Sequence, residues 1–115
     1  MKIATLDQLV KIDGVVLAFE FASDGKLVNY KANVEMSSEM ATMAAQFCAS
    51  VTMNFNTLAG AFTRLSSMPW VPQQGWAYAG GEYTVAIGGD GYRGVFIESA
   101  KANFNQLFQM LVGRP

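Results

Sequence analysis

Apolar and polar positions along the chain repeat with periods that change from segment to segment, and each change marks a new element. Leu6 and Leu9 lie at helical spacing, and Thr5 followed by Gln8 has the form of a capping box, the side-chain arrangement that begins many helices. The pattern predicts a short first helix over about residues 6–12.

The next segment alternates with the period of a strand. From Val15 to Phe21 the odd positions are the more apolar ones, as expected for a strand with one face on a core. Asp24 and Gly25 form a turn dipeptide that leads into a second alternating run from Leu27 to Lys31. These residues predict a β-hairpin.

A long helix is predicted next. Ser37 and Ser38 are capping residue types, and Glu39 suits the positive end of a helix dipole. The apolar period continues to about Leu65, where Arg64 suits the negative end. We expect one uninterrupted helix between these limits.

Short runs separated by glycine follow. The runs Gly75 to Ala79, Tyr83 to Ile87 and Tyr92 to Glu98 predict three strands, with Gly80-Gly81 and Gly88 to Gly91 as the turns of an antiparallel meander.

A last helix is expected to be capped by Ser99 and to end at Gly113. Its apolar positions are Phe104, Leu107, Phe108 and Leu111. The predicted order is α-β-β-α-β-β-β-α. Since no repeat or linker divides the sequence, we expect one domain over residues 1–115.

The long helix carries two stripes on a helical wheel. A bulky stripe, expected to pack on the sheet, consists of Met36, Met40, Met43, Phe47, Val51, Phe55, Leu58, Phe62 and Leu65. A small-residue stripe, expected to face away from the sheet, consists of Ala41, Ala45, Ala49, Thr52, Asn56, Ala59 and Thr63. Exposed helix faces usually carry charges, and this stripe carries none. The pattern therefore favours a second copy of the helix packed against the small-residue stripe.

Charge is sparse in the middle of the chain. Charged residues make up 15% of the sequence, against about 25% in an average domain, and over residues 40–81 the only charged side chain is Arg64. The uncharged strand from Gly75 to Ala79 would be a hazardous free edge unless a partner paired with it. We therefore predict a twofold homodimer. Its expected interface residues are Ala41, Ala45, Ala49, Thr52, Asn56, Ala59, Trp76 and Tyr78.

Composition excludes several classes of function. The chain has no histidine, which removes His-based catalytic triads and His-containing metal sites, and its single cysteine excludes an internal disulfide and multi-cysteine metal sites. A net charge of −1 with scattered basic residues argues against nucleic acid. Asp7 stands where a signal peptide needs an apolar run, and no apolar stretch is long enough to cross a membrane. We expect a cytoplasmic protein that is not an enzyme and needs no metal or cofactor.

Four features of the sequence are candidate sites of chemistry or binding. Cys48 has no basic neighbour within a helical turn, so a buried structural thiol is favoured over a nucleophile. Gly88 to Gly91 lacks the Lys-Ser/Thr of a phosphate-binding loop and is better explained as a turn. Arg64 and Arg93 are candidates for a partner contact at a phosphoryl group, although a helix-end or surface role is favoured. Trp70, between two prolines, is either a core plug or a partner contact.

The segment from Gly14 to Gly25, the long Ala-rich helix and the end from Ala102 to Leu107 together resemble the roadblock family, named for dynein light chains, over nearly the whole chain. The resemblance implies an α+β, profilin-like three-layer α/β/α fold. In that fold a five-stranded antiparallel sheet in the order 2-1-5-4-3 has one long helix on one face and two shorter helices on the other. It also implies dimers that pair their third strands and pack their long helices side by side.

Roadblock proteins are typically non-catalytic scaffolds and regulators of small GTPases. The leading hypothesis is therefore a homodimeric scaffold or regulator that acts through protein–protein contacts, with a small GTPase as the implied partner. One alternative is a small-molecule sensor, in which the bulky stripe lines an apolar cavity. Another is an accessory protein of a sulfur-oxidising heterodisulfide-reductase-like system, suggested by similarity to small bacterial relatives, or an enzyme subunit that uses Cys48 in thiol chemistry.

Overall fold

Helices and strands follow one another in the predicted order. In the computed structural model, which describes residues 3–113, the first elements are α1 (Leu6–Val10), β1 (Val15–Phe21) and β2 (Leu27–Ala32). The others are α2 (Ser38–Ser66), β3 (Trp76–Gly80), β4 (Tyr83–Gly88), β5 (Arg93–Glu98) and α3 (Phe104–Val112), with 3-10 turns η1 (Gly89–Gly91) and η2 (Ser99–Lys101).

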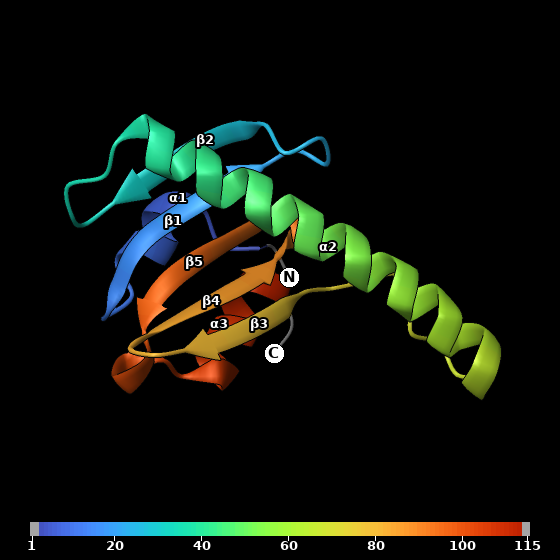
Figure 1. The fold of residues 1–115 in the computed structure, drawn as a ribbon. Coiled ribbons are helices and arrows are strands. Elements are labelled where there is room, and N and C mark those ends of the chain that lie inside the picture. Colours follow the sequence, from blue (N-terminus) through green and yellow to red (C-terminus); the bar gives the residue numbers. More distant parts are fainter. Residues whose placement is uncertain (1–2, 114–115) are drawn as a thin grey trace.

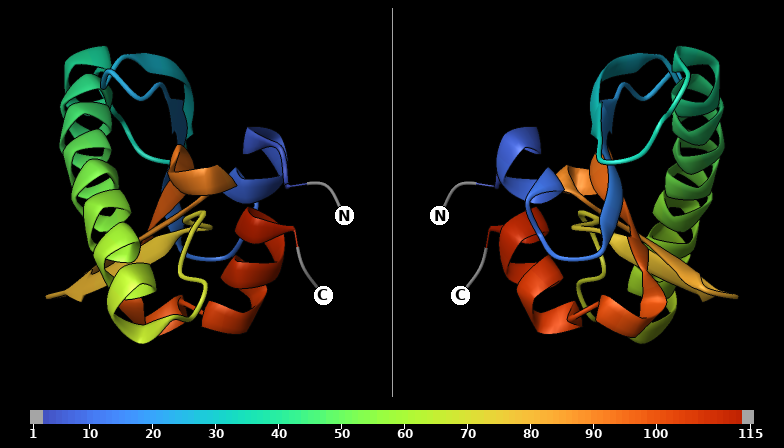
Figure 2. Two further views of the ribbon diagram at one scale, coloured as in Figure 1. Left: turned by 90° about the vertical axis from the view of Figure 1, so that its right-hand side faces the viewer. Right: turned by 90° about the vertical axis from the view of Figure 1, so that its left-hand side faces the viewer.

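The five strands form one antiparallel sheet in the order β2-β1-β5-β4-β3 (Figure 1). Figure 2 shows α2 on one face of the sheet and α1 and α3 on the other. The three-layer, profilin-like arrangement implied by the resemblance is confirmed, and β2 and β3 are the edges of the sheet.

Side-chain caps begin the first two helices where the sequence predicts. At α1 the Thr5 hydroxyl accepts the Gln8 backbone N–H at 3.2 Å, and Gln8 Oε1 accepts the Thr5 N–H at 2.9 Å, which completes the capping box. At α2 the Ser37 hydroxyl accepts the Met40 N–H at 3.1 Å. Each cap satisfies backbone donors that have no partner within the first turn of a helix.

The cap of the last helix differs from the prediction. Asn103 caps α3, and its Oδ1 accepts the Gln106 N–H at 3.1 Å. Ser99 begins the separate turn η2, and its hydroxyl shares a 2.8 Å hydrogen bond with that of Thr84 on β4. The prediction that Ser99 caps this helix was wrong because the chain makes an extra 3-10 turn before α3 begins.

Apolar side chains cover both faces of the sheet. The core on the α1 and α3 face includes Leu9, Val95, Ile97, Leu107 and Leu111. The core on the α2 face is built on Leu17, Phe19 and Phe21 of β1, with the Phe19 and Phe21 rings stacked at 5.5 Å. Full burial of one such large side chain contributes roughly 1.5–3 kcal/mol.

The two stripes of α2 face opposite ways from the prediction. The small-residue stripe packs on the sheet, with Ala41, Ala45 and Thr52 inaccessible to solvent. From Met40 onward the bulky stripe points away, so Met40 and Met43 are exposed and not core filler, whereas Met36, which precedes the helix, packs against the core. The reason lies in β1, because its large inward side chains already fill the space beneath the helix, and small helical side chains let the two backbones approach.

This reversal corrects the predicted dimer interface. Ala41, Ala45, Ala49 and Thr52 are buried within one copy of the chain and cannot contact a second copy. A charge at Ala45 would therefore be placed in the core and would unfold the protomer.

The long helix extends beyond the sheet. α2 has 29 residues, about 43 Å at the helical rise, and the molecule measures 45 × 29 × 29 Å. Figure 1 shows its last turns projecting past the sheet and the following segment returning beneath them to β3. We call the part from Phe55 to Gly75 the arm.

Candidate protein-interaction surface

The bulky stripe forms a row of exposed apolar side chains along α2. Phe47 is 72% exposed and Met43 68%, and the row continues into the arm through Leu58 and Phe62. Glu39 and Arg64, near the two ends, are the only charged residues of the helix. Contiguous exposed apolar surface of this kind marks a site of association.

The free edge of β3 adjoins this row. Its sequence, Trp76 to Gly80, has no charge, and Tyr78 is 66% exposed. The opposite edge of the sheet, β2, carries Lys31 and follows Lys26, and lysines protect an edge from pairing with another chain. The two edges therefore differ, and only β3 is suited to backbone pairing with a partner.

A groove of about 730 Å³ lies between the helix and the strand. It is lined by Met43, Ala44, Phe47, Cys48, Val51, Phe55, Trp76, Ala77, Tyr78, Val85 and Phe96. At one end the rings of Phe55 and Trp76 lie 5.8 Å apart and join α2 to β3. We call the bulky stripe, this groove and the β3 edge together the α2–β3 surface.

Cys48 lies at the base of the groove, where its side chain is 2% exposed. Burial raises the pKa of its thiol to about 12, so the nucleophilic thiolate is suppressed at neutral pH. The prediction of a buried structural thiol is confirmed, and the environment opposes thiol chemistry at this residue.

Trp76 is fixed in place by hydrogen bonds. Its indole N–H donates to the Thr52 hydroxyl at 2.8 Å, and that hydroxyl donates to the Gly91 carbonyl at 2.7 Å. A Cβ at Gly91 would lie 2.5 Å from the Thr52 side chain, so only glycine allows this approach. Trp76 and Thr52 were predicted as interface residues from the sequence. In the structure their hydrogen bonds join β3, α2 and η1.

Two of the predicted partner-binding residues lie on the arm. Trp70 is 51% exposed, packs its ring on Phe62 at 5.3 Å and donates its indole N–H to the Ser66 hydroxyl at 3.1 Å. Arg64 is exposed near the end of α2 and makes no ion pair with any residue in the described part of the chain. Trp70 is therefore not a core plug, because half of its surface stays open.

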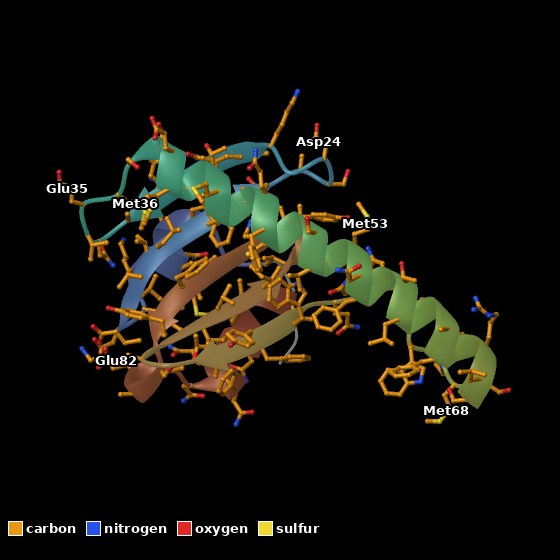
Figure 3. All side chains as sticks on the ribbon, viewed as in Figure 1. Asp24, Glu35, Met36, Met53, Met68 and Glu82 are labelled. Carbon is orange, nitrogen blue, oxygen red and sulfur yellow. The ribbon has the colours of Figure 1, made fainter. Side chains whose placement is uncertain are left out.

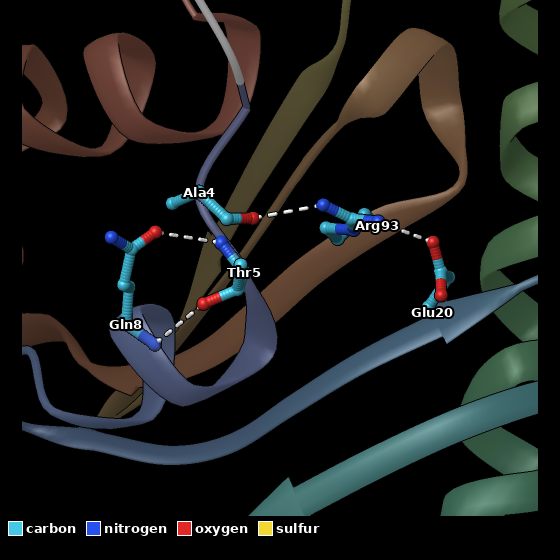
Figure 4. A network of polar contacts seen from close by, with 5 residues as sticks. All are labelled: Ala4, Thr5, Gln8, Glu20 and Arg93. Carbon is cyan, nitrogen blue, oxygen red and sulfur yellow. Dashed lines mark hydrogen bonds and ion pairs between the residues drawn. The ribbon is translucent and has the colours of Figure 1, made fainter.

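Arg93 lies apart from them. Its guanidinium pairs with Glu20 at 2.5 Å and donates to the Ala4 carbonyl at 2.9 Å (Figure 4). These contacts tie β5 to β1 and to the segment before α1. The structure does not bring the three candidates together, and it gives Arg93 a structural role.

Asn56 and Ala59 occupy a position between the two faces of α2. Asn56 is exposed and its Oδ1 accepts the Gln73 side-chain N–H at 2.8 Å, while Ala59 is half-buried beside the returning segment. Both belong to the packing of the arm. The exposed apolar residues that the sequence analysis missed are those of the bulky stripe. The available signal was the row of large residues on β1, which leaves no room for a second row of large residues beneath α2.

The small-molecule sensor stays a prediction. The bulky stripe lies outside the core, and Met43, Phe47, Val51 and Phe55 of this stripe line the open groove between α2 and β3. Within residues 3–113, no group of three His, Cys, Asp or Glu side chains is arranged to hold a metal ion. No helix in the same range is both long and apolar enough for a transmembrane segment.

Solved structures share this fold at low sequence identity. A roadblock/LC7 domain from Streptomyces avermitilis is 12% identical, with a TM-score of 0.71 over 94% of this chain and 86% of that one. MglB from Myxococcus xanthus is 13% identical, with a TM-score of 0.66 over 94% and 89%. A structure described as MglB with tetrameric arrangement is also 13% identical, with a TM-score of 0.69 over 94% and 82%. These likenesses show the roadblock fold.

Sequence comparison gives the family. No curated protein matches the chain. The model of the family described as "Uncharacterized conserved protein (DUF2173)" matches residues 5–112. The chain therefore belongs to the DUF2173 family and has the roadblock fold.

Proposed function

We propose that the protein is a non-catalytic, homodimeric scaffold or regulator of the cytoplasm, and that two copies associate through the α2–β3 surface. The observation that carries the proposal is the joint exposure of an apolar helix row and an uncharged sheet edge on the same side of the molecule. Strand pairing would satisfy the free backbone groups of β3, and helix packing would cover the apolar row.

The geometry favours an isologous arrangement. A twofold axis beside β3 would pair the β3 strands of the two copies antiparallel. It would also set the two α2 helices antiparallel, because α2 and β3 have a fixed position relative to each other within each copy. The groove of each copy would then receive apolar side chains of the other α2. The likeness to a solved MglB with a tetrameric arrangement supports self-association.

Light scattering on the purified protein tests the dimer. The wild type is expected to have twice the protomer mass at micromolar concentration. Phe47→Glu is expected to have the mass of one protomer, because the change would bury an unpaired charge in the interface. Met53→Glu is the matched control, since Met53 is 61% exposed but lies outside the bulky stripe. A monomeric wild type, or equal dissociation by both variants, would overturn the proposal.

We also propose a small GTPase as the class of partner. The resemblance to roadblock proteins supports this, and Arg64 is an exposed cation on the arm that could reach a phosphoryl group. The test is GTP hydrolysis by a small GTPase from the same source, with and without the protein. Arg64→Ala should reduce any effect and Arg93→Ala should act only through stability; a rate unchanged by wild-type protein would contradict the proposal.

A further inference from the structure

A further cleft lies between α3 and the start of β3. It has a volume of about 390 Å³, which is within the usual range of small-molecule sites. We call it the α3–β3 cleft. Because α3 and α2 cover different faces of the sheet (Figure 2), this cleft and the groove beside α2 open on opposite faces. The α3–β3 cleft is lined by Gln74, Gly75, Trp76, Ala77, Ala86, Ile87, Phe104, Leu107, Phe108, Leu111 and Val112.

Small residues on two strands create the space for this cleft. Ala77 of β3 and Ala86 of β4 are direct partners in the antiparallel pair, so their side chains point to the same face of the sheet. Ala86 belongs to the core on the α1 and α3 face, which places both methyl groups on that face. Alanine is uncommon in strands, where larger side chains usually fill the space beneath a helix. The two alanines therefore form a low floor, and the volume above them is the cleft.

Aromatic side chains of α3 form the wall beside this floor. Phe104 and Phe108 lie one helical turn apart and are 53% and 49% exposed. Leu107 and Leu111 of the same helix are buried and hold α3 on the sheet. Half-exposed rings offer a face or an edge to a further ring, and aromatic pairs of this kind are favourable. The wall is therefore suited to an aromatic ligand.

Close backbone packing holds the cleft in shape. A Cβ at Gly75 would overlap the carbonyl oxygen of Ile87, and a Cβ at Gly88 would lie 2.5 Å from Leu111. The start of β3 thus lies directly against β4, and the end of β4 lies directly against α3. A site that is already formed binds a ligand with little loss of conformational entropy.

Length and lack of charge limit what the cleft can hold. α3 has 9 residues, so the wall is about 13 Å long at the helical rise. None of the residues that line the cleft is charged. Figure 3 shows Glu82, the charged residue of the β3–β4 hairpin, at the turn, beyond the part of β3 that lines the cleft. The cleft therefore fits a short, uncharged molecule.

We infer that the α3–β3 cleft is a binding site for a small, uncharged aromatic molecule that carries a polar group. The rings of Phe104 and Phe108 contact the ligand ring, and the alanine floor sets its depth. The amide of Gln74 can donate to or accept from a hydroxyl or carbonyl of the ligand. An ionised group would find no counter-charge in this cleft. The inference goes beyond the proposed homodimer and does not depend on it, because one copy of the chain forms the whole cleft.

Titration with 4-fluorophenol, a neutral ring with one hydroxyl, tests the site. In nitrogen-15-labelled protein the backbone amide signals of Ala77, Ala86 and Phe108 should shift and reach saturation, with a dissociation constant of roughly 1 mM or below. 4-Fluorobenzoate has the same ring with a carboxylate. It should bind about tenfold more weakly or less, because the cleft offers no partner for its charge.

A variant that fills the cleft locates the binding. Ala77→Leu places a larger apolar side chain on the floor and should weaken 4-fluorophenol binding tenfold or more. Ala79→Leu is the matched control, since Ala79 is also exposed and lies on the same face of the same strand, but outside the cleft. Phe108→Ala removes part of the wall and should also weaken binding, which gives the same test if Ala77→Leu does not fold.

Each outcome decides the inference. Saturable binding that Ala77→Leu or Phe108→Ala weakens and Ala79→Leu leaves unchanged would support it. Shifts centred on Phe47 and Cys48 would place the probe in the groove beside α2 and would overturn it. Equal binding by all variants, or of both probes, would also overturn it. So would the absence of saturable binding, which would leave the cleft to a side chain of another protein. The mass by light scattering, which tests the homodimer, is a separate result.

Discussion

One buried hydroxyl, that of Thr52, joins three elements of the fold. It accepts the indole N–H of Trp76 and donates to the carbonyl of Gly91, and the residue is inaccessible to solvent. The sequence pattern places Thr52 on the small-residue stripe, which was expected to face away from the sheet. A threonine among alanines does not indicate that its hydroxyl has hydrogen-bond partners far along the chain.

Thr52→Val is therefore expected to lower the free energy of unfolding by about 1–3 kcal/mol, since it leaves a buried donor and a buried acceptor without partners. Thr52→Ser keeps the hydroxyl and should cost less. Urea unfolding at a fixed protein concentration measures both variants. Equal stability of the two would show that the hydrogen bonds of Thr52 contribute little.

Cys48 makes stability depend on pH in the alkaline range. Burial raises its pKa from 9.0 to about 12, so above pH 9 the thiol ionises in the unfolded chain while it stays protonated in the folded one. The unfolded state then binds fewer protons, and stability falls as pH rises between these two values. From pH 9 upward, the free energy of unfolding of the wild type should fall relative to that of Cys48→Ala. A difference between the two that stays constant up to pH 11 would contradict this.

At the scale of elements, most of the fold follows from local patterns. The Asp24-Gly25 turn, the capping box at Thr5 and the glycine-separated runs are signals carried by a few neighbouring residues, and they placed every strand to within about a residue or two. The facing of α2 is not local. Both of its stripes are uncharged, and the choice between them depends on Phe19 and Phe21 of a distant strand.

Two glycines test how closely the elements pack. A Cβ at Gly88 would lie 2.5 Å from Leu111 of α3, so Gly88→Ala must displace that helix and should cost about 1–3 kcal/mol. At Gly60 in α2 a Cβ would meet nothing within 4 Å, and Gly60→Ala should stabilise the helix by about 0.5–1 kcal/mol. Thermal unfolding of both variants checks this; a destabilised Gly60→Ala would mean that another chain lies close to α2 there.

At the scale of the whole molecule, the sparse charge of residues 40–81 correctly indicated where the unusual surface lies, but not which side of the helix forms it. An uncharged stretch of sequence does not distinguish a core from an interface, because both exclude water. The sequence therefore located the α2–β3 surface by element and missed its residues on α2.

If two copies cover this surface, stability must depend on concentration. Association stabilises the folded state by mass action, so the Tm of the wild type should rise as the protein concentration is raised through the dissociation constant. Phe47→Glu should have a lower Tm that does not change with concentration, because its fold is intact and only the contact is lost. Differential scanning calorimetry over a hundredfold range of concentration measures this. A wild-type Tm that is independent of concentration while light scattering reports a monomer would contradict the homodimer.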